Sequence, residues 1–415
     1  MLYWIFHQQI CYILCLLSLI CQNVLIKDIN SLNKTKFMKY FLNLPSLGKK
    51  EIRYVNSALK SNWLSSRGKN TKIFEKKFAK FLGIKYALAV QSGTAAIHLL
   101  LKAINIKPGD NVIIPNYSCV SSISATVQCL AKPIIVEIEN NTLGLDFSLV
   151  KKAIDKYKPK ALQLVHIYGF PARDSLKIKK YCNEKKVVLI EDCSEALGAE
   201  INNRKVGTFG DASIFSIRSE KMIGVGEGGV VCTNDSYLFN KIELLASRNA
   251  PYRIKSSPLW KKYYHLGEGY NYLMPHLLGS VARGQIERFK NEILCKKIEI
   301  GNFYRKIKSK NFRMTQTAMK NAKPVYWLNS IYFENLDKFK VRKIGEMLMK
   351  YGIEVRPGFW PLSDLKKFSS KYVGKEKVSR NIFEKTLALP SNFSLSNKDV
   401  KLIIKKVEYL INKIK

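Results

Sequence analysis

Three short segments of the sequence bring hydroxyl, carboxylate and amine side chains next to glycines, as a site for an anionic ligand and a reactive amine requires. The first, VQSGTAAIHLL, places Ser92, Gly93 and Thr94 between an apolar run and a helical pattern. The first N–H groups of a helix lack internal partners, and small residues let an anion approach them, so this segment suits a phosphate. Serine and threonine are also common helix caps, so the segment alone indicates a plain N-cap equally well.

The second segment, VVLIEDCSEALGA, ends an apolar run in Glu191 and Asp192. A carboxylate buried at the end of a strand needs a cationic partner, because an isolated buried charge is costly. The protonated ring nitrogen of a pyridine cofactor is such a partner, and holding that proton makes the ring an electron sink. Read alone, the segment favours a helix-capping aspartate.

The third segment, FSIRSEKMIGVGEGGVV, places Ser216 at the end of an apolar run, Lys221 five residues later and a glycine cluster behind it. Glycines let the backbone turn tightly beside a ligand. A lysine between apolar walls can lose its proton and attack a carbonyl to form a Schiff base. Because lysines are abundant here and usually solvated, Lys221 gains significance only from the joint pattern.

The order of these segments resembles the DegT/DnrJ/EryC1/StrS family of sugar aminotransferases. The likeness covers roughly residues 45–410, through blocks such as GDNVIIPNYSCVSS, VHIYGFPARD, KVGTFGDASIFS and GYNYLMPHLLGSVARGQIERF. It implies an α/β, aspartate-aminotransferase-like fold (fold type I), in which a large domain with a mainly parallel sheet carries a smaller α+β C-terminal domain. It also implies pyridoxal 5′-phosphate (PLP) as cofactor.

Carried over by position, the resemblance assigns a role to each segment. Lys221 is expected to be the Schiff-base lysine and proton shuttle, and Asp192 to pair with the pyridinium nitrogen. The other expected cofactor-binding residues are Ser92, Gly93, Thr94, Ser216, Glu195 and, from a second subunit, Asn271. The substrate-binding candidates are His166, Tyr168, Arg248, Arg356 and Trp360.

The implied reaction moves an amino group from an amino acid, expected to be glutamate, to a nucleotide-linked keto-deoxysugar, in a homodimer with shared active sites. Glu195 stands where many members carry His or Gln, and glutamate is common there in the perosamine-synthase-like branch. This favours a GDP-linked 4-keto-6-deoxyhexose and a role in surface polysaccharide synthesis. A 3-keto sugar and a non-catalytic PLP-binding regulator stay open, whereas Lys221 argues against the family's dehydratases, which carry histidine there.

Two positions depart from the family's pattern, and both bear on substrate fit. The block GYNYLM has Leu273 where the family has arginine, and the candidates to compensate are Arg248 and Arg283. Cys119 stands where an aromatic ring is expected over the cofactor. Neither departure changes the expected reaction type.

Alternating strand and helix patterns must position these segments. Strands are expected in YALAV, NVIIP, AKPIIVEI, ALQLVHIYG, VVLIED, ASIFSI and GGVVCT, which are apolar enough for a sheet covered on both faces. The pattern KKEIRYVNSALKS predicts an amphipathic helix with Ile52, Val55 and Leu59 on one face, and Gly83 predicts a helix C-cap. A long helix then leads into the smaller part, so the expected divisions are 1–37, 38–290 and 291–415.

Composition narrows the protein class. The 415 residues are 47% hydrophobic, enough for a large core, and the formal net charge of +38 comes from lysines scattered among Ile and Asn. Scattered lysines favour a coding bias over nucleic-acid binding, although a positive field also attracts anionic substrates. Nine cysteines without a C-x-x-C pair indicate reduced thiols in a cytoplasmic protein, and five histidines without ligand spacing indicate no metal site.

The N-terminal segment admits three interpretations. Residues 1–26 carry no charged side chain, and ICYILCLLSLIC is almost entirely apolar. We rank first a start-site artefact with translation from Met38, second a membrane anchor that leaves the main domain in the cytoplasm, and third a cleaved signal. A membrane is therefore an expected partner only if this segment is translated.

Overall fold

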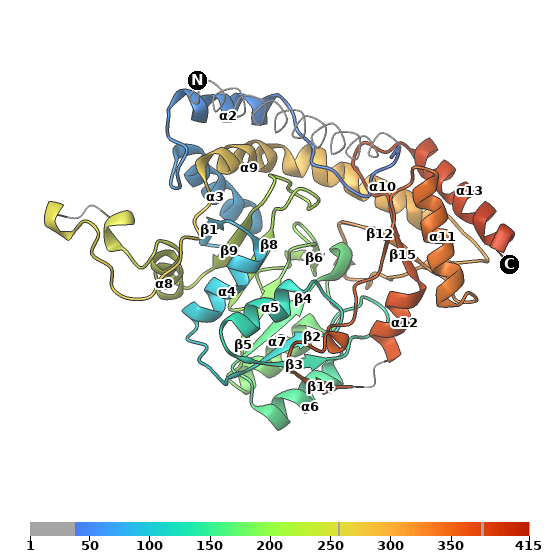
Figure 1. Cartoon of the computed structure of the whole chain (residues 1–415), viewed down its shortest axis with the longest axis horizontal. Coiled ribbons are helices and arrows are strands. Elements are labelled where there is room, and N and C mark those ends of the chain that lie inside the picture. Colours follow the sequence, from blue (N-terminus) through green and yellow to red (C-terminus); the bar gives the residue numbers. More distant parts are fainter. Residues whose placement is uncertain (1–37, 256–257, 375–376, 415) are drawn as a thin grey trace, which may run out of the picture.

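The computed structural model describes residues 38–255, 258–374 and 377–414, and an eight-stranded sheet lies at its centre (Figure 1). The strand order is β1-β9-β8-β5-β4-β2-β3-β14. Neighbours are parallel from β8 through to β14, whereas β9 is antiparallel to both β8 and β1. The mainly parallel sheet of the predicted α/β fold is therefore present.

Every predicted strand segment contains a strand of this sheet. The strands are β1 (Tyr86–Val90), β2 (Asn111–Pro115), β3 (Lys132–Val136), β4 (Ala161–Val165), β5 (Val188–Asp192), β8 (Ala212–Ser216) and β9 (Gly229–Thr233), with β14 (Lys371–Val373) at the edge. The helices connected with them are α3 (Lys69–Leu82), α4 (Gly93–Ala103), α5 (Ser121–Gln128), α6 (Phe147–Tyr157), α7 (Ser175–Glu184) and α8 (Ser236–Ala246). Helix α3 ends at Gly83, whose φ of 82° confirms the predicted left-handed C-cap.

Both faces of the sheet are covered, as its apolar strands predict. Ile190 and Ile214 pack in one core cluster with residues of α4, α5 and α8. Leu189 points the other way, into a cluster with α6 and α7, and Phe215 packs on that opposite side with α3 and α9 (His276–Arg288). Alternate residues of a strand thus enter opposite cores.

Helix α2 (Lys49–Lys60) forms where predicted, but the prediction of its buried face is wrong. Glu51 and Tyr54 are buried, whereas Ile52 and Leu59 are 62% and 49% exposed. The Arg288 Nε of α9 donates to Glu51 Oε1 over 3.1 Å, so a buried ion pair, and not the apolar stripe, sets the helix face that packs on α9.

The C-terminal part has its own four-stranded antiparallel sheet in the order β10-β12-β15-β13. Helix α9, a π-helical turn (Phe289–Leu294) and α10 (Cys295–Lys306) make the predicted long connection. The sheet consists of β10 (Arg313–Met314), β12 (Asn329–Tyr332), β13 (Arg356–Pro357) and β15 (Thr386–Leu389), and it packs with α11 (Lys338–Lys350), α12 (Lys377–Lys385) and α13 (Asn397–Ile414). A third, three-stranded sheet joins β6 (Glu200–Ile201), β7 (Arg204–Lys205) and β11 (Ala322–Lys323). Because β14 returns to the large sheet, the two parts interleave, and the division near residue 290 stays a prediction.

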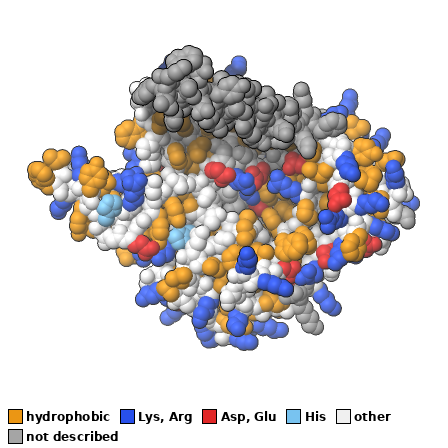
Figure 2. Space-filling view, in the orientation of Figure 1, with side chains coloured by type: hydrophobic (Ala, Val, Ile, Leu, Met, Phe, Trp, Pro, Cys, Tyr) orange, Lys and Arg blue, Asp and Glu red, His pale blue; other side chains and the backbone are white. Residues whose placement is uncertain are grey.

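Surface charge and helix hydrophobicity are relevant to the predictions about nucleic acid and membrane as partners. Lys and Arg side chains are spread over the visible face, with acidic groups between them and without a single basic stripe (Figure 2). No helix among the described residues has the length and apolarity needed to cross a membrane. The predictions about residues 1–37 lie outside the described residues.

A side chain at position 229 should destabilise the protein. A Cβ there would lie 2.4 Å from the Ser92 carbonyl oxygen, because β9 passes directly beside the start of α4. We expect Gly229→Ala to lower the free energy of unfolding by about 1–3 kcal/mol, as overpacking does. Gly345→Ala in α11 is the control, since its nearest neighbour there is the flexible end of Leu387 at 3.3 Å. Equal urea-unfolding midpoints for the two variants would contradict this prediction.

Candidate active site

Lys221 lies in the loop between β8 and β9, and this loop is braced from within. Ser219 donates its N–H to the Gly226 carbonyl over 2.9 Å. Arg218 pairs with Glu220 at 3.2 Å and with Glu227 at 3.1 Å, which explains the charged residues on either side of the lysine. These contacts within the loop brace the segment that carries Lys221.

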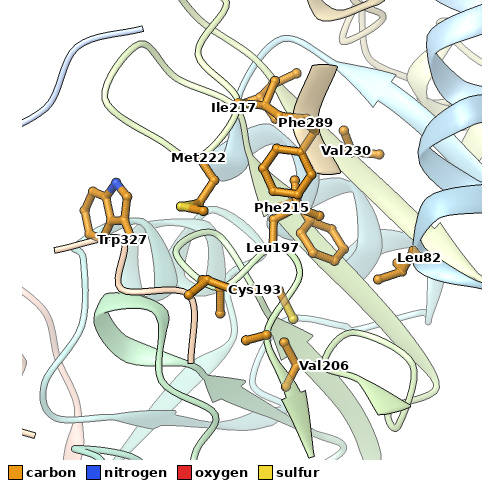
Figure 3. Close-up of a cluster of buried hydrophobic side chains, with 14 of the residues drawn as sticks. Leu82, Cys193, Leu197, Val206, Phe215, Ile217, Met222, Val230, Phe289 and Trp327 are labelled. Carbon is orange, nitrogen blue, oxygen red and sulfur yellow. The ribbon is translucent and has the colours of Figure 1, made fainter. Parts of the chain in front are cut away.

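Apolar residues of the same loop anchor it to the core. Ile217 and Met222 are buried in the cluster that contains Phe215, Leu197 and Phe289 (Figure 3). Since the residue after Lys221 is held in this cluster, the lysine itself stays at the cluster's margin.

The Lys221 amine is held between a carboxylate and an indole ring. Its Nζ lies 3.2 Å from Glu195 Oε1 and 3.7 Å from the centre of the Trp327 ring. Only 11% of the Lys221 side chain is exposed. Burial raises the pKa of Glu195, and the neighbouring Lys221 opposes that rise. The pair is thus a desolvated acid–base couple, of the kind found where protons are moved.

The second oxygen of Glu195 is fixed by the main chain. Glu195 Oε2 accepts the Tyr168 N–H over 2.8 Å, and Tyr168 has a φ of 54° in the short 3-10 turn η2 (Ile167–Gly169). A left-handed tyrosine is unfavourable and requires support from its surroundings. Here the Tyr168 hydroxyl lies 3.1 Å from the Tyr117 hydroxyl, and its ring packs 5.5 Å from that of Phe359.

Asp192 is a buried carboxylate at the carboxyl end of β5. Its Oδ1 accepts the Ser194 N–H over 3.0 Å, and no lysine or arginine among the described residues forms an ion pair with it. Burial raises the pKa of Asp192, and the Ser194 hydrogen bonds and Lys221 only partly oppose this. The carboxylate is therefore suited to a cation from a ligand.

Glu191, the residue before Asp192, has a structural role. Its carboxylate accepts the N–H groups of Gly207, Phe209 and Gly210 over 2.8, 2.6 and 2.6 Å. Burial alone would raise the pKa of Glu191, but hydrogen bonds from His166 and from these main-chain groups hold it below its ordinary value.

His166 is likewise fully engaged. Its Nδ1 accepts the Ala172 N–H over 3.0 Å, so Nε2 carries the proton and donates to Glu191 over 3.2 Å. Together with Cys193 these two side chains form a compact buried group, the one set in the described part of the chain with metal-ligand spacing. Both ring nitrogens are already used, so this histidine orients Glu191 and is not available to a metal.

A phosphate cradle lies at the N-terminus of α4. Ser92 Oγ accepts the Ala95 N–H over 3.0 Å, so Ser92 is the N-cap, while the N–H groups of Gly93 and Thr94 lie in the first turn. A Cβ at Gly93 would lie 3.1 Å from the Ser216 Cβ, so Ser216 faces this turn directly. Two first-turn N–H groups and a hydroxyl are the donors that a phosphate needs.

The segment 271–274 runs beside this cradle. Tyr272 accepts the Gln91 N–H over 2.9 Å, and the Asn271 carbonyl accepts from Gln91 Nε2 over 2.8 Å. Asn271 is exposed, so its side chain lies at the molecular surface. Leu273 is buried beside Val90.

Of the two candidates to replace the missing arginine, Arg283 is committed elsewhere. It donates to Asn70 Oδ1 over 2.8 Å and pairs with Glu287 at 3.2 Å. Arg248 is exposed, with a φ of 64° and its N–H bound to the Tyr270 carbonyl. Arg248 therefore remains the candidate.

The remaining substrate candidates lie on the C-terminal part. Arg356 is exposed, pairs with Glu354 at 3.2 Å, and is near enough to Tyr168 to act on its ionisation. Trp360 packs on Phe383 at 4.5 Å, whereas its neighbour Phe359 joins the aromatic group around Tyr168. The aromatic ring that packs on Tyr168 is therefore that of Phe359 and not that of Trp360.

The Cys119 side chain reaches the cradle from the other side. Its Sγ lies 3.3 Å from Ser121 Oγ, which in turn accepts from Thr94 Oγ1 over 3.0 Å. The thiol thus adds a polar contact to the start of α4, and the expectation that position 119 lies over the cofactor stays a prediction.

The sequence reasoning missed Trp327. It lies in the block PVYWLNSIYF, whose apolar residues are typical of a strand, but the strand β12 begins only at Asn329. Its indole Nε1 donates to the Glu220 carbonyl over 2.6 Å while the ring covers the amine. No local pattern signals such a long-range contact.

Comparisons with known proteins identify the family of the chain. The model of the DegT/DnrJ/EryC1/StrS aminotransferase family matches residues 45–408. GDP-perosamine synthase of Vibrio cholerae is 36% identical over 86% of the chain and 92% of that protein. GDP-perosamine synthase of Escherichia coli O157:H7 is 34% identical over 89% of the chain and 98% of that protein. The Helicobacter pylori aminotransferase PseC, involved in the biosynthesis of pseudoaminic acid, aligns with a TM-score of 0.82 at 25% identity, over 90% of the chain and 99% of PseC. The predicted family and the predicted fold are confirmed.

Removing the Asp192 charge should stabilise the protein when no cofactor is added. The pKa of Asp192 is raised in the folded protein, so above that pKa the ionised carboxylate destabilises the folded state relative to the unfolded state. This destabilisation disappears below the ordinary pKa of 3.8, where the carboxyl group is protonated in both states. We expect Asp192→Asn to raise the free energy of unfolding at pH 7 by roughly 1–3 kcal/mol, the range for a poorly satisfied buried polar group. The difference should narrow as the pH falls. Urea unfolding at several pH values measures it, and a destabilised Asp192→Asn at pH 7 would refute the reasoning.

Proposed function

The chain belongs to the DegT/DnrJ/EryC1/StrS aminotransferase family, and we propose that it moves an amino group from glutamate to a GDP-linked 4-keto-6-deoxyhexose. The proposal rests on one observation. The Lys221 amine, largely shielded from solvent, lies against Glu195 and close to Asp192, a buried carboxylate that has no ion-pair partner among the described residues. The choice of sugar is supported by the relatives named GDP-perosamine synthase, which align over most of the chain. The product would serve surface polysaccharide synthesis.

The described residues fit PLP, the cofactor of this family. Asp192 would hold the proton on the ring nitrogen, which explains a buried carboxylate without a protein counter-ion. The Gly93 and Thr94 N–H groups and the Ser216 hydroxyl would bind the phosphate, and a larger residue at 93 would intrude on Ser216. When bound, PLP supplies an electron sink for the carbon that carries the amine.

Lys221 would be the acid–base group of both half-reactions. Its Nζ would take the proton from Cα of glutamate in the first and deliver a proton to the sugar carbon in the second, each balanced by the opposite proton transfer at the cofactor carbon that carries the amine. General acid–base help of this kind is typically worth about 10²–10⁴ in rate. Glu195 keeps the amine within reach, because it binds Nζ with one oxygen and the Tyr168 N–H with the other.

The nucleotide sugar would bind where exposed cations meet the site. Arg248 and Arg356 are exposed and would pair with the diphosphate, since a guanidinium matches phosphate oxygens with two N–H groups. Trp360 is half exposed and offers a ring further out on the same part of the chain.

We further propose a homodimer with shared active sites, located in the cytoplasm. An arm, residues 258–266, projects from the body beside α8 and carries hydrophobic side chains at its end (Figures 1 and 2). Leu259, Trp260 and Tyr263 are 64%, 93% and 81% exposed. Such apolar area is usually covered by a partner, and a second copy would also bring the exposed Asn271 to a neighbouring cradle.

Reconstitution with PLP tests the proposed chemistry. We expect borohydride reduction to fix PLP on the peptide that contains Lys221, and Lys221→Ala to lose this attachment together with at least about 10²-fold of the activity. Lys290→Ala, at an exposed lysine, is the matched control.

With glutamate as donor, mass spectrometry across GDP-, UDP- and dTDP-linked keto sugars should show amination of the GDP-linked 4-keto sugar. Amination of only a 3-keto sugar would overturn the substrate assignment, and a protein that takes up no PLP would overturn the function.

Mixing two inactive variants tests the shared site. Lys221→Ala and Asn271→Ala subunits should each have low activity, but a mixed dimer regains one complete site. Random pairing of equal amounts should therefore restore roughly a quarter of the wild-type activity if each site uses both subunits. Trp260→Ser with Tyr263→Ser should sediment as a monomer and lose activity. Mixtures no more active than the mean of their components would contradict the shared site.

A further inference from the structure

Lys297 is a fully buried lysine on α10 whose ammonium joins three distant segments. Its Nζ donates to Asn43 Oδ1 over 2.9 Å, to the Trp327 carbonyl over 3.1 Å and to the Ser391 carbonyl. These three acceptors use all three N–H groups of an ammonium. No carboxylate within the described ranges forms an ion pair with it.

A buried cation without a counter-ion is an unfavourable way to join segments. Taking an ammonium out of water is costly, and only neutral oxygens compensate here. Burial accordingly lowers the pKa of Lys297 to about 7. An apolar side chain at this place would fill the space without that penalty. What the ammonium contributes instead is its three hydrogen bonds.

Two of the three partners of Lys297 lead directly to the catalytic loop. The side chains of Asn43, through Nδ2, and Trp327, through Nε1, both donate to the carbonyl of Glu220. Glu220 is the residue before Lys221, and the Trp327 ring lies over the Lys221 Nζ. Lys297 thus binds Asn43 and Trp327. Both of these bind the backbone just before Lys221, and the Trp327 ring also covers the Lys221 amine.

We propose that Lys297 is a positioning residue of the reaction, which acts through Asn43 and Trp327 to keep the Lys221 amine between Glu195 and the indole ring. The inference rests on the proposed role of Lys221. It assigns Lys297 no contact with substrate or cofactor. It also makes Trp327 the link that carries the effect, because its carbonyl binds Lys297 while its ring covers Nζ.

Three variants separate positioning from mere support. Lys297→Met removes the ammonium, and Asn43→Asp keeps an acceptor for Lys297 but removes the donor to Glu220. Trp327→Phe keeps an aromatic ring but loses the indole N–H. Lys296→Met is the matched control, because Lys296 is the preceding residue of α10 and pairs at the surface with Glu299.

The first measurement is the acetylation rate of Lys221 in cofactor-free protein, compared by mass spectrometry with the exposed lysines of the same sample. We expect a several-fold faster reaction of Lys221 in the three variants, because the amine is released from its two neighbours, and no change in Lys296→Met. In reconstituted enzyme we expect kcat to fall about tenfold or more while KM for the sugar changes less than about twofold, the pattern of a lost transition-state effect.

The outcomes decide the proposal even if Lys297→Met fails to fold, since Asn43→Asp and Trp327→Phe retain the buried lysine. Folded variants with wild-type Lys221 reactivity and kcat would overturn the inference while leaving the proposed function intact. A wild-type protein that does not attach PLP at Lys221 would instead overturn the proposed function.

Discussion

The contact between the Lys221 amine and the Glu195 carboxylate, 3.2 Å apart and nearly out of solvent, is the interaction that the other parts of the site support. It exists because β8, β5 and β4 are neighbours in the sheet. Ligands of such sheets bind at the carboxyl ends of the strands, and there β8 leads into the Lys221 loop while β5 ends at Asp192, three residues before Glu195. The chain after β4 supplies the Tyr168 N–H that fixes the second oxygen of Glu195. Strand order thus converts three separate sequence segments into one buried acid–base pair.

The strands and most helices could be predicted from the sequence because their signals are local, whereas Lys221 and Asp192 were singled out only by the order of three segments and its resemblance to a family. Apolar runs gave the strands, and a glycine after a helical pattern gave the Gly83 C-cap. The resemblance assigned the role to Asp192, and the structure adds the physical reason, because hydrogen bonds already satisfy the Glu191 carboxylate. The buried face of α2 was predicted wrongly for a similar reason, because the Glu51 ion pair outweighs its apolar stripe.

Trp327 and Lys297 could not be found in this way, since their significance lies in contacts across the fold. One signal was nevertheless present. Lys297 lies on the apolar face of the helix, four residues after Ile293 and three before Ile300. A lysine at such a position is unfavourable unless its amine has buried hydrogen-bond acceptors. The acceptors come from residue 43 and from the C-terminal part, and Asn43 and Trp327 contact the Lys221 loop from more than 100 residues away in either direction. The surroundings of Lys221 therefore include distant segments of the described chain as well as the large sheet.

Three unfavourable features of the core lie near Lys221. Other buried carboxylates, such as Glu191 and Glu139, receive several hydrogen bonds each. Near the amine, by contrast, Asp192 lacks a cation, Tyr168 is left-handed and Lys297 lacks a counter-ion. A ligand with a protonated ring nitrogen would relieve only the first of these and would leave the other two as they are. They are better understood as the fixed framework that keeps the amine in place, and natural proteins tolerate such strain where geometry has to be over-determined.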